Sequence, residues 1–182
     1  MSRFEQEVKI RDARDEEREQ IAHVMLEAYR QYAFDMPRER WEEYRENIRS
    51  SVYGNGPYAR LVAELDGEIV GSVQLFLTSE AAYGRSDLGI ESPIIRLLAV
   101  SPYARRRGVA KLLLREAARR SLQLGARTLY LHTSDMMAAA VKLYESLGFE
   151  RAYEADTSNG ETLVKSYKIQ LTDALPLLQA GV

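Results

Sequence analysis

The sequence predicts an α/β fold (an α+β mixed sheet), a twisted mixed sheet of about seven strands with helices on both faces. Residues 94–100 form a nearly continuous apolar run, which is typical of a central strand covered on both faces. Asp66-Gly67 and Asn159-Gly160 each separate two strand-like runs, and these dipeptides are strong hairpin signals. Hairpins at both ends of a strand-helix-strand unit indicate a sheet with parallel and antiparallel neighbours.

The N-terminal segment is predicted to contain one strand and two helices. Residues 8–11 alternate apolar and polar side chains, as a short strand does. Apolar residues at helical spacing then predict an amphipathic helix: Ile21, Val24, Met25, Ala28, Tyr29 and Tyr32. Pro37 suits the first turn of a second helix, which carries Trp41, Tyr44 and Ile48.

The next segment is predicted to be a β-hairpin followed by a loop. Residues 58–65 and 68–77 are the two strands, on either side of Asp66-Gly67. Residues 78–92 contain Gly, Ser and Asp without a clear period, so we expect a loop there.

The C-terminal half continues the alternation of strands and helices. Ser101-Pro102 ends the central strand, and Gly125 and Gly148 are suited to end the two helices that follow. The predicted elements are a helix from about 108 to 124, a strand at 128–132, a helix at 136–147, and strands at 151–155 and 163–170.

Composition indicates one globular domain, residues 1–182 with its core at about 8–170, because 182 residues with 46% hydrophobic side chains match one domain length. The absence of cysteine excludes disulfides and thiolate catalysis, and no metal-ligand spacing is present. The N-terminus is charged, and no run reaches the ~20 apolar residues of a membrane span, so we expect a cytoplasmic protein. A net charge of −2 and a pI of about 5.8 argue against nucleic acid or a membrane as partner.

One segment has the chemistry of a phosphate site. The central strand is followed by Arg105-Arg106-Arg107-Gly108-Val109-Ala110, and then by a helix. A helix start exposes unpaired backbone N–H groups and the positive end of the helix dipole. Small residues at 108 and 110 let phosphates approach the backbone, and the arginines add positive charge. A solvated arginine cluster at a helix start is the other interpretation of this segment.

A second segment, Leu143-Tyr144-Glu145-Ser146-Leu147-Gly148-Phe149, has a structural and a functional interpretation. Structurally, it is a helix with Tyr144 on its apolar face, ended by Gly148, with Phe149 packing back. Functionally, four fixed residues in the pattern Leu-Tyr-x-x-x-Gly-Phe coincide by chance in only about one chain in a thousand.

In this order, and joined by one strand, the two segments resemble those of the GNAT superfamily of N-acetyltransferases. The resemblance extends from about Val8 to Gln170 and is most specific from Ile94 to Phe149. It implies the GNAT fold, acetyl-CoA as co-substrate, no metal, and an amine acceptor, either a small molecule or a peptide.

The resemblance also implies roles for individual residues. The strand ending Leu98-Ala99-Val100 offers backbone groups to the pantetheine arm, and two neighbouring parallel strands splay apart around the thioester. Tyr144 protonates the departing thiolate, a role that suits a phenol, whose ordinary pKa is ~10. The amide of Leu98 or Ala99 polarises the thioester carbonyl. The remaining residues assigned to the coenzyme are Arg105, Arg106, Arg107, Gly108, Val109, Ala110, Lys111 and Met137.

Two positions depart from the family pattern and leave the general base open. Met137 stands where many members have an Asn that contacts the cofactor, and Ile94 stands where many have a catalytic Glu. A lysine-like ammonium, with an ordinary pKa of ~10.4, must lose a proton before it attacks. Glu91 acting through water, Asp87, or no protein base at all are the alternatives.

The first two helices hold many aromatic residues, and in GNAT-like proteins this region lines the acceptor site. Phe34, Met36 and Trp41 are the candidates for substrate binding, whereas Tyr29 and Tyr32 lie on the core face and are expected to pack there. His132, at a strand end, is interpreted as a structural histidine.

A non-catalytic acyl-CoA sensor is the main alternative function, because of the residues at 94 and 137. A P-loop nucleotide-binding protein is disfavoured, since no Gly-Lys-Ser/Thr ends the loop. Dimers are the commonest oligomers, which makes a homodimer the simplest assembly to consider.

Overall fold

The structure is a computed structural model that describes residues 7–54, 56–133, 138–159, 162–172 and 175–178. The chain forms two compact units. The first unit comprises residues 1–74 and 97–114, and the second comprises residues 75–96 and 115–182.

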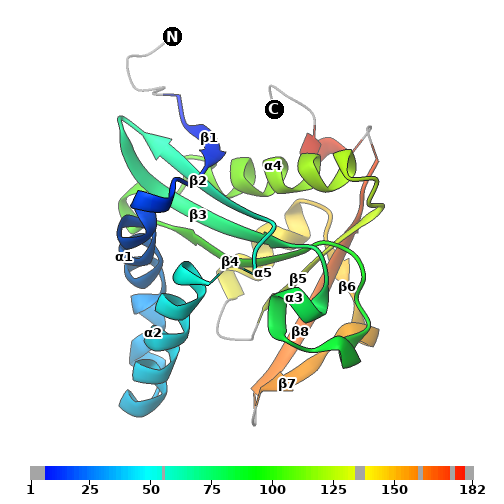
Figure 1. The fold of residues 1–182 in the computed structure, drawn as a ribbon, viewed down its shortest axis with the longest axis horizontal. Helices are drawn as coiled ribbons and strands as arrows, with labels where there is room; N and C mark the ends of the chain where they lie inside the picture. The colour runs from blue at the N-terminus through cyan, green and yellow to red at the C-terminus, as the bar shows by residue number, and fades with distance from the viewer. Residues whose placement is uncertain (1–6, 55, 134–137, 160–161, 173–174, 179–182) are drawn as a thin grey trace. The chain divides into compact units, whose positions relative to one another are not determined.

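The elements alternate much as the sequence predicts (Figure 1). Strands pair in the order β1-β2-β3-β4-β5-β8-β6, and β7 pairs with β8 beside this path. The helices are α1 (Arg18–Tyr29), α2 (Arg38–Tyr53), α3 (Ser79–Tyr83), α4 (Val109–Gln123) and α5 (Ala138–Ser146). The strands are β1 (Lys9–Asp12), β2 (Ala59–Leu65), β3 (Glu68–Phe76), β4 (Ile94–Val100), β5 (Thr128–Thr133), β6 (Glu150–Arg151), β7 (Thr157–Asn159) and β8 (Thr162–Gln170).

The first hairpin confirms the turn chemistry of Asp-Gly. Asp66 and Gly67 have φ angles of 54° and 80°, and two central residues with positive φ are what a two-residue hairpin turn requires. β2 and β3 follow each other directly across this turn, and β1 pairs antiparallel with β2. The predicted face of α1 is buried, from Ile21 through Tyr29.

Helices pack on both faces of β3 in the first unit. A Cβ built on Gly71 would lie 3.0 Å from Val109 Cγ1 and 3.2 Å from Leu113 Cδ1 of α4. The side chain of Gln74, an odd number of residues along the strand, points to the other face and donates from Nε2 to the Ser51 carbonyl of α2. α1 and α2 lie side by side, with an edge-to-face contact between Tyr29 and Tyr44 (Figure 1).

The second unit is built on β5 and β8. β5 pairs antiparallel with β8 over six residue pairs and parallel with β4 over two, Ile94–Tyr130 and Ile95–Leu131. The expected strand at 151–155 is wrong for most of its length, because β6 ends at Arg151 and residues 153–155 form a 3-10 turn. The strand that pairs with β8 across Asn159-Gly160 is instead β7, through Asn159 and Thr162.

The loop expected at 78–92 is wrong in part, because residues 79–83 of it form the short helix α3. The Thr78 hydroxyl accepts a hydrogen bond from the Ala81 amide at its start, and Gly84 ends it with a φ of 67°. Ser79 and Ile90 bond to each other across the segment, Ser79 N–H to the Ile90 carbonyl and Ile90 N–H to the Ser79 hydroxyl. Five residues are too few to show a helical period, so local caps and tertiary contacts, absent from the apolar pattern, decide this segment.

A partly buried ion pair links the start of the first unit to β2. Arg11 Nη1 and Nη2 donate to the two carboxylate oxygens of Glu17 at 2.8 and 2.7 Å, and Nη2 also reaches Glu64 of β2 at 3.2 Å. Glu17 is 7% exposed. The Arg11 hydrogen bonds, aided by the Arg14 amide, lower the pKa of Glu17 to about 2.

We expect Arg11→Met to destabilise the protein by about 3 kcal/mol at pH 7, because it leaves the buried Glu17 carboxylate without its charge partner. The stabilisation that Glu17 contributes is present above its unfolded pKa and is lost as the pH falls from about 4.5 towards 2. Chemical unfolding measures the difference, which should therefore shrink in acid. Arg30→Met, which breaks an exposed pair with Glu27, is the control and should cost less than about 1 kcal/mol. Equal effects of the two variants would contradict this account of the pair.

Candidate active site

The predicted phosphate site is a loop that ends in the start of α4. Arg106 and Gly108 have φ angles of 66° and 76°, and the first turn closes with a bond from the Leu112 amide to the Gly108 carbonyl. Within the described part of the chain, the amides of residues 106–111 make no hydrogen bond to a backbone carbonyl or side chain. Six adjacent donors without a protein partner, at the positive end of a 15-residue helix, form a favourable environment for an anion.

The loop leaves room for a ligand. A Cβ built on Gly108 meets no atom within 4 Å, so positive φ rather than crowding favours glycine there. Arg106 and Arg107 are exposed, and Ala110 and Lys111 are half-buried, whereas Val109 is buried and anchors the helix.

Gly71 lets three elements meet at one place. A Cβ there would lie 3.1 Å from the carbonyl oxygen of Ala99 in β4, besides its contacts with Val109 and Leu113. The missing side chain therefore brings the end of β4 and the start of α4 together on β3. Our sequence interpretation did not single out Gly71, although a glycine inside an apolar strand is a recognised sign of close backbone approach.

The end of β4 has an irregular backbone. Leu97 has a φ of 55°, which is rare for a non-glycine residue and typical of a strained or bulged strand. The carbonyl of Leu98, the next residue, accepts a hydrogen bond of 2.5 Å from the Tyr29 hydroxyl. Tyr29 is buried, as expected, but its hydroxyl reaches the strand assigned to the coenzyme, which the sequence pattern does not predict.

Arg105 is directed to the end of α1. Its Nη1 donates to Gln31 Oε1 at 2.8 Å and its Nη2 to the Ala28 carbonyl at 3.1 Å. All three arginines of the loop are exposed, and these bonds direct the guanidinium of Arg105 toward the end of α1.

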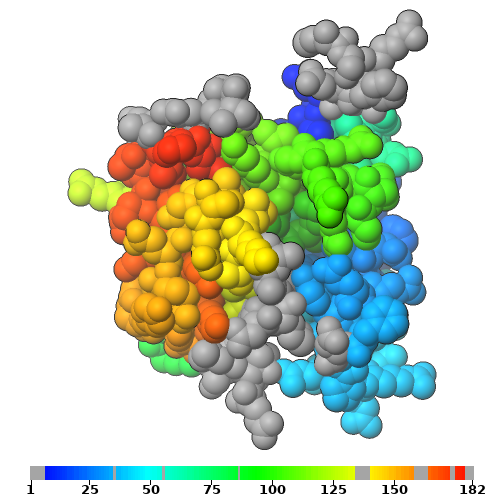
Figure 2. All heavy atoms as spheres, turned by 180° about the vertical axis from the view of Figure 1, so that it is seen from behind, coloured from blue at the N-terminus to red at the C-terminus, as the bar shows by residue number. Residues whose placement is uncertain are grey.

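Tyr144 is positioned by the end of its helix. The Phe149 amide donates to the Tyr144 carbonyl and the Gly148 amide to the Glu145 carbonyl, which is the Schellman arrangement around a glycine of positive φ, here 102°. The Phe149 ring packs edge-on against the Tyr144 ring at 6.0 Å, and Tyr144 is 8% exposed. The structural interpretation of this motif is confirmed, and it gives the phenol a defined place in the second unit. In Figure 2, α5 (yellow) lies on the face turned to the viewer, beside the orange segment that follows it.

The acceptor candidates differ in environment. Trp41 is half-buried and stacks on Tyr44 at 6.1 Å, and Tyr44 in turn contacts Tyr29. Met36 is half-buried, whereas Phe34 is 90% exposed. Trp41 therefore belongs to an aromatic cluster that includes Tyr29, while Phe34 projects from the surface.

The two carboxylate candidates for the base lie in the second unit and differ in charge environment. Asp87 forms two hydrogen bonds with Arg85, at 3.2 and 2.7 Å, which hold its pKa below the usual range. Glu91 is exposed and makes no hydrogen bond or ion pair with any described residue. Arg85 thus makes Asp87 a weaker proton acceptor than an ordinary aspartate.

His132 lies in a buried polar cluster. Its Nδ1 is 2.8 Å from the Tyr83 hydroxyl, and the rings meet edge to face at 5.2 Å. Burial raises the pKa of Tyr83 to about 12 and lowers that of His132 to about 4. Both groups are therefore neutral, and the imidazole tautomer decides which of them donates in this hydrogen bond. The Arg96 guanidinium lies 4.6 Å from the Tyr83 ring centre. This geometry agrees with a structural role for His132.

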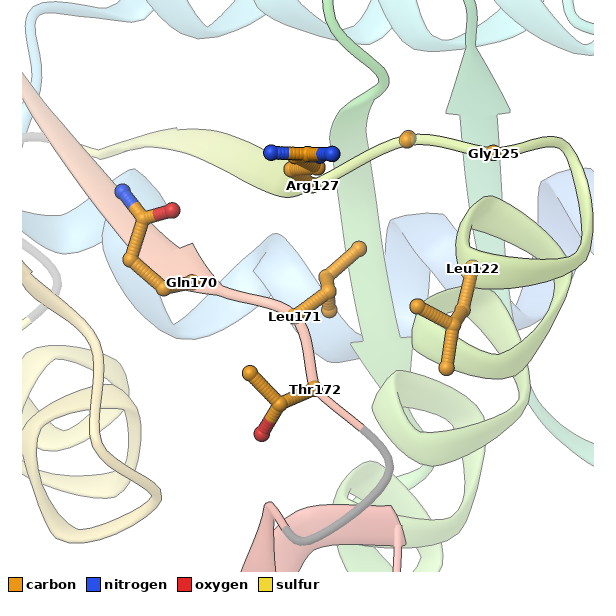
Figure 3. Close-up of a pocket in the computed structure, with 7 residues that line it drawn as sticks. Leu122, Gly125, Arg127, Gln170, Leu171 and Thr172 are labelled. Atoms are coloured by element: carbon orange, nitrogen blue, oxygen red, sulfur yellow. The ribbon is translucent and has the colours of Figure 1, made fainter.

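Met137, the other residue assigned to the coenzyme, lies outside the described residues. A pocket of the second unit, shown in Figure 3, is lined by Leu122, Gly125, Ala126, Arg127, Gln170, Leu171 and Thr172, none of which is a predicted site residue. The described residues contain no cluster of three metal-ligating side chains, and their helices are too short or too polar to cross a membrane.

Comparison with known proteins decides the family. Residues 16–149 match the model of the acetyltransferase (GNAT) family, which is most of the chain. The chain belongs to the GNAT family.

Among curated relatives of this GNAT protein, N-acetyltransferase family 8 member 2 of Rattus norvegicus is 30% identical over 115 residues, 63% of this chain and 49% of that protein. The uncharacterized N-acetyltransferase YjgM of Escherichia coli (strain K12) is 33% identical over 101 residues, 54% of this chain and 55% of that protein. The chain thus spans about half the length of these relatives.

Solved structures confirm the GNAT fold. The PaiA N-acetyltransferase from Thermoplasma acidophilum, in complex with coenzyme A, has a TM-score of 0.71 at 18% identity and covers 90% of this chain and 99% of its own. The ribosomal-protein-S18-alanine N-acetyltransferase from Escherichia coli has a TM-score of 0.61 at 18% identity, covering 96% and 97%. The fold class expected from the sequence is therefore confirmed.

We expect the stability of this GNAT protein to fall in mild acid because of His132. Its folded pKa of about 4 lies below the ordinary 6.5, so only the unfolded chain binds this proton between those values. Lowering the pH from 7 to 5 should therefore cost about 2 kcal/mol of unfolding free energy through this group.

Guanidinium unfolding at both pH values measures this difference. His132→Gln should flatten the pH dependence, whereas His23→Gln, at an exposed position of α1, should retain it. An unchanged slope in His132→Gln would show that this histidine is not buried in its neutral form.

Proposed function

We propose that the protein is an N-acetyltransferase that moves the acetyl group of acetyl-CoA to a primary amine by direct attack in a ternary complex. The observation that supports this most is the run of amides at 106–111, without a protein partner at the start of α4. Membership of the GNAT family supplies the reaction class, and a structural neighbour carries coenzyme A.

The chain's own residues fit the coenzyme in two places. The amides of 106–111 would hold the diphosphate, with Arg106 and Arg107 supplying exposed positive charge. The backbone of Leu98 to Val100 would pair with the amides of the pantetheine arm. The open space at Gly108 removes a steric obstacle to the phosphates.

The reaction forms one bond and breaks another. The amine nitrogen attacks the thioester carbon, and the amide of Leu98 or Ala99 stabilises the negative charge that develops on the carbonyl oxygen. The carbon–sulfur bond then breaks, the Tyr144 hydroxyl gives its proton to the thiolate, and the amine proton passes to solvent or a base. In this proposal Glu91 is that base, acting through water, because Arg85 makes Asp87 a weaker proton acceptor.

The acceptor is bound beside the first two helices in this proposal. Trp41 and Met36 are half-buried apolar side chains that suit the carbon skeleton of an amine, and Phe34 is exposed enough to close over it. A small-molecule or peptide amine fits this description.

A non-catalytic acyl-CoA sensor is the second candidate, favoured by Ile94 at the family's glutamate position. Release of free thiol from acetyl-CoA across a panel of amines separates the two functions. The enzyme releases thiol only with a suitable amine, whereas a sensor binds the coenzyme and releases none.

We expect Tyr144→Phe to lower kcat by about 10²–10⁴-fold, because it removes the proton donor and keeps the ring that packs on Phe149. Steady-state thiol release measures this effect, and calorimetry should show little change in coenzyme affinity. Tyr153→Phe removes an exposed hydroxyl of the same unit and should leave kcat within about twofold. Full turnover in Tyr144→Phe would remove this residue from the mechanism.

We expect Gly108→Glu to weaken coenzyme A binding by about 100-fold or more, roughly 2.7 kcal/mol, because its carboxylate occupies and repels the phosphate site. Gly108→Asn controls for backbone strain, since asparagine tolerates the φ of 76° and carries no charge. Isothermal calorimetry with coenzyme A compares the two variants. Equal affinities for the glutamate variant and the unmodified protein would disprove the assignment of this loop.

A further inference from the structure

The last residue of α1 contacts the strand assigned to the thioester. The Tyr29 hydroxyl donates to the Leu98 carbonyl at 2.5 Å, although the two residues are 69 positions apart in the chain. Both belong to the first unit. Tyr29 is 5% exposed, so this bond is formed away from water, where a hydrogen bond is hard to replace.

This bond restrains the part of β4 that contains the proposed oxyanion donors. Along a strand, the N–H and C=O of one residue point to the same edge, and successive residues alternate between the two edges. The Ser101 amide bonds to Val70 of β3 and the Ala99 carbonyl lies close to Gly71 of β3, so Ala99 faces β3 and Leu98 faces the opposite edge. The Leu98 amide is therefore the candidate donor on the edge that Tyr29 restrains through the Leu98 carbonyl.

The backbone at this point needs a restraint. Leu97 has a φ of 55°, a conformation that costs about 1–3 kcal/mol and persists only where surrounding contacts impose it. The Tyr29 hydroxyl bonds to the residue directly after it. The Tyr29 ring is itself held by Tyr32 at 6.1 Å and Tyr44 at 6.0 Å, so the donor has a fixed position.

The end of α1 also contacts the phosphate loop. Arg105 bonds to the carbonyl of Ala28, the residue before Tyr29, and to Gln31. Neighbouring residues of α1 thus bond to β4 and to the loop that opens α4. Because the two bonds come from different side chains, a substitution of Tyr29 removes the bond to β4 and leaves the bond from Arg105 to Ala28 in place.

We propose that Tyr29 is a positioning residue for acetyl transfer, holding the Leu98 backbone so that the Leu98 amide is preset for the thioester carbonyl. This inference rests on the proposed acetyltransferase function. Tyr29 does not touch the reacting atoms, and it acts through the main chain of β4.

Tyr29→Phe tests the inference because it keeps the ring and removes one hydroxyl. Thiol release should show kcat lowered by about 10–100-fold, since small misplacements of catalytic groups have effects of this size. Coenzyme A affinity by calorimetry should stay within about threefold, because the phosphate loop is unchanged, and the pH profile should keep its shape, because Tyr29 exchanges no proton. Hydrogen exchange of residues 97–100 in the ligand-free protein should become faster.

Tyr53→Phe is the matched control. The Tyr53 hydroxyl bonds to Glu19, near the opposite end of α1, so this variant also removes one hydroxyl bond in the first unit. It should leave kcat and the exchange of residues 97–100 within about twofold. A loss of thermal stability in both variants, with kcat lowered only in Tyr29→Phe, separates positioning from stabilisation.

The outcomes decide between the proposals. If the unmodified protein acetylates an amine and Tyr29→Phe has unchanged kcat, the positioning role is wrong and the proposed function stands. If the unmodified protein binds coenzyme A but acetylates no amine, the proposed function fails, and exchange at 97–100 alone tests whether Tyr29 holds β4. Should Tyr29→Phe not fold, a slowly exchanging Tyr29 hydroxyl proton in NMR of the unmodified protein, close to the Leu98 amide, supports the proposal, and its absence overturns it.

Discussion

The close contact of β3, β4 and α4 at Gly71 is the constraint on which the rest of the first unit depends. A Cβ at this position would lie 3.1 Å from the Ala99 carbonyl oxygen and 3.0 Å from Val109 Cγ1, closer than ordinary van der Waals contact, so a side chain here would push these groups apart. Burial of Val109 and Leu113 then holds the start of α4 in place. Arg106 and Gly108, both at positive φ, turn the chain into α4. The amides of 106–111 make no bond to the described protein groups in this turn.

The end of α1 adds a second set of restraints to the same region. Arg105 ties the loop to α1, and Tyr29 ties β4 to α1. In both links a polar side chain bonds to a main-chain carbonyl, Arg105 to Ala28 and Tyr29 to Leu98.

Much of this arrangement can be predicted from the sequence, and the remainder has identifiable physical causes. The hairpin at Asp66-Gly67, the apolar face of α1 and the glycine end of α5 follow from local rules of backbone geometry and periodicity. The helix α3 and the course of residues 151–159 depend on contacts with distant segments, such as Ser79 with Ile90 and Asp156 with Ser166. No local pattern encodes such contacts. The same holds for Tyr29, whose position on the apolar face predicts burial but not the partner of its hydroxyl.

The proposed function requires that the amides of 106–111 bind the diphosphate of coenzyme A. The most direct test is a titration of the ¹⁵N-labelled protein with coenzyme A, followed by NMR of the backbone amides. We expect the signals of residues 106–111 to shift most strongly, with smaller changes at Leu98 to Val100. Shifts confined to other segments, such as the pocket around Gln170, with those six amides unaffected, would contradict it.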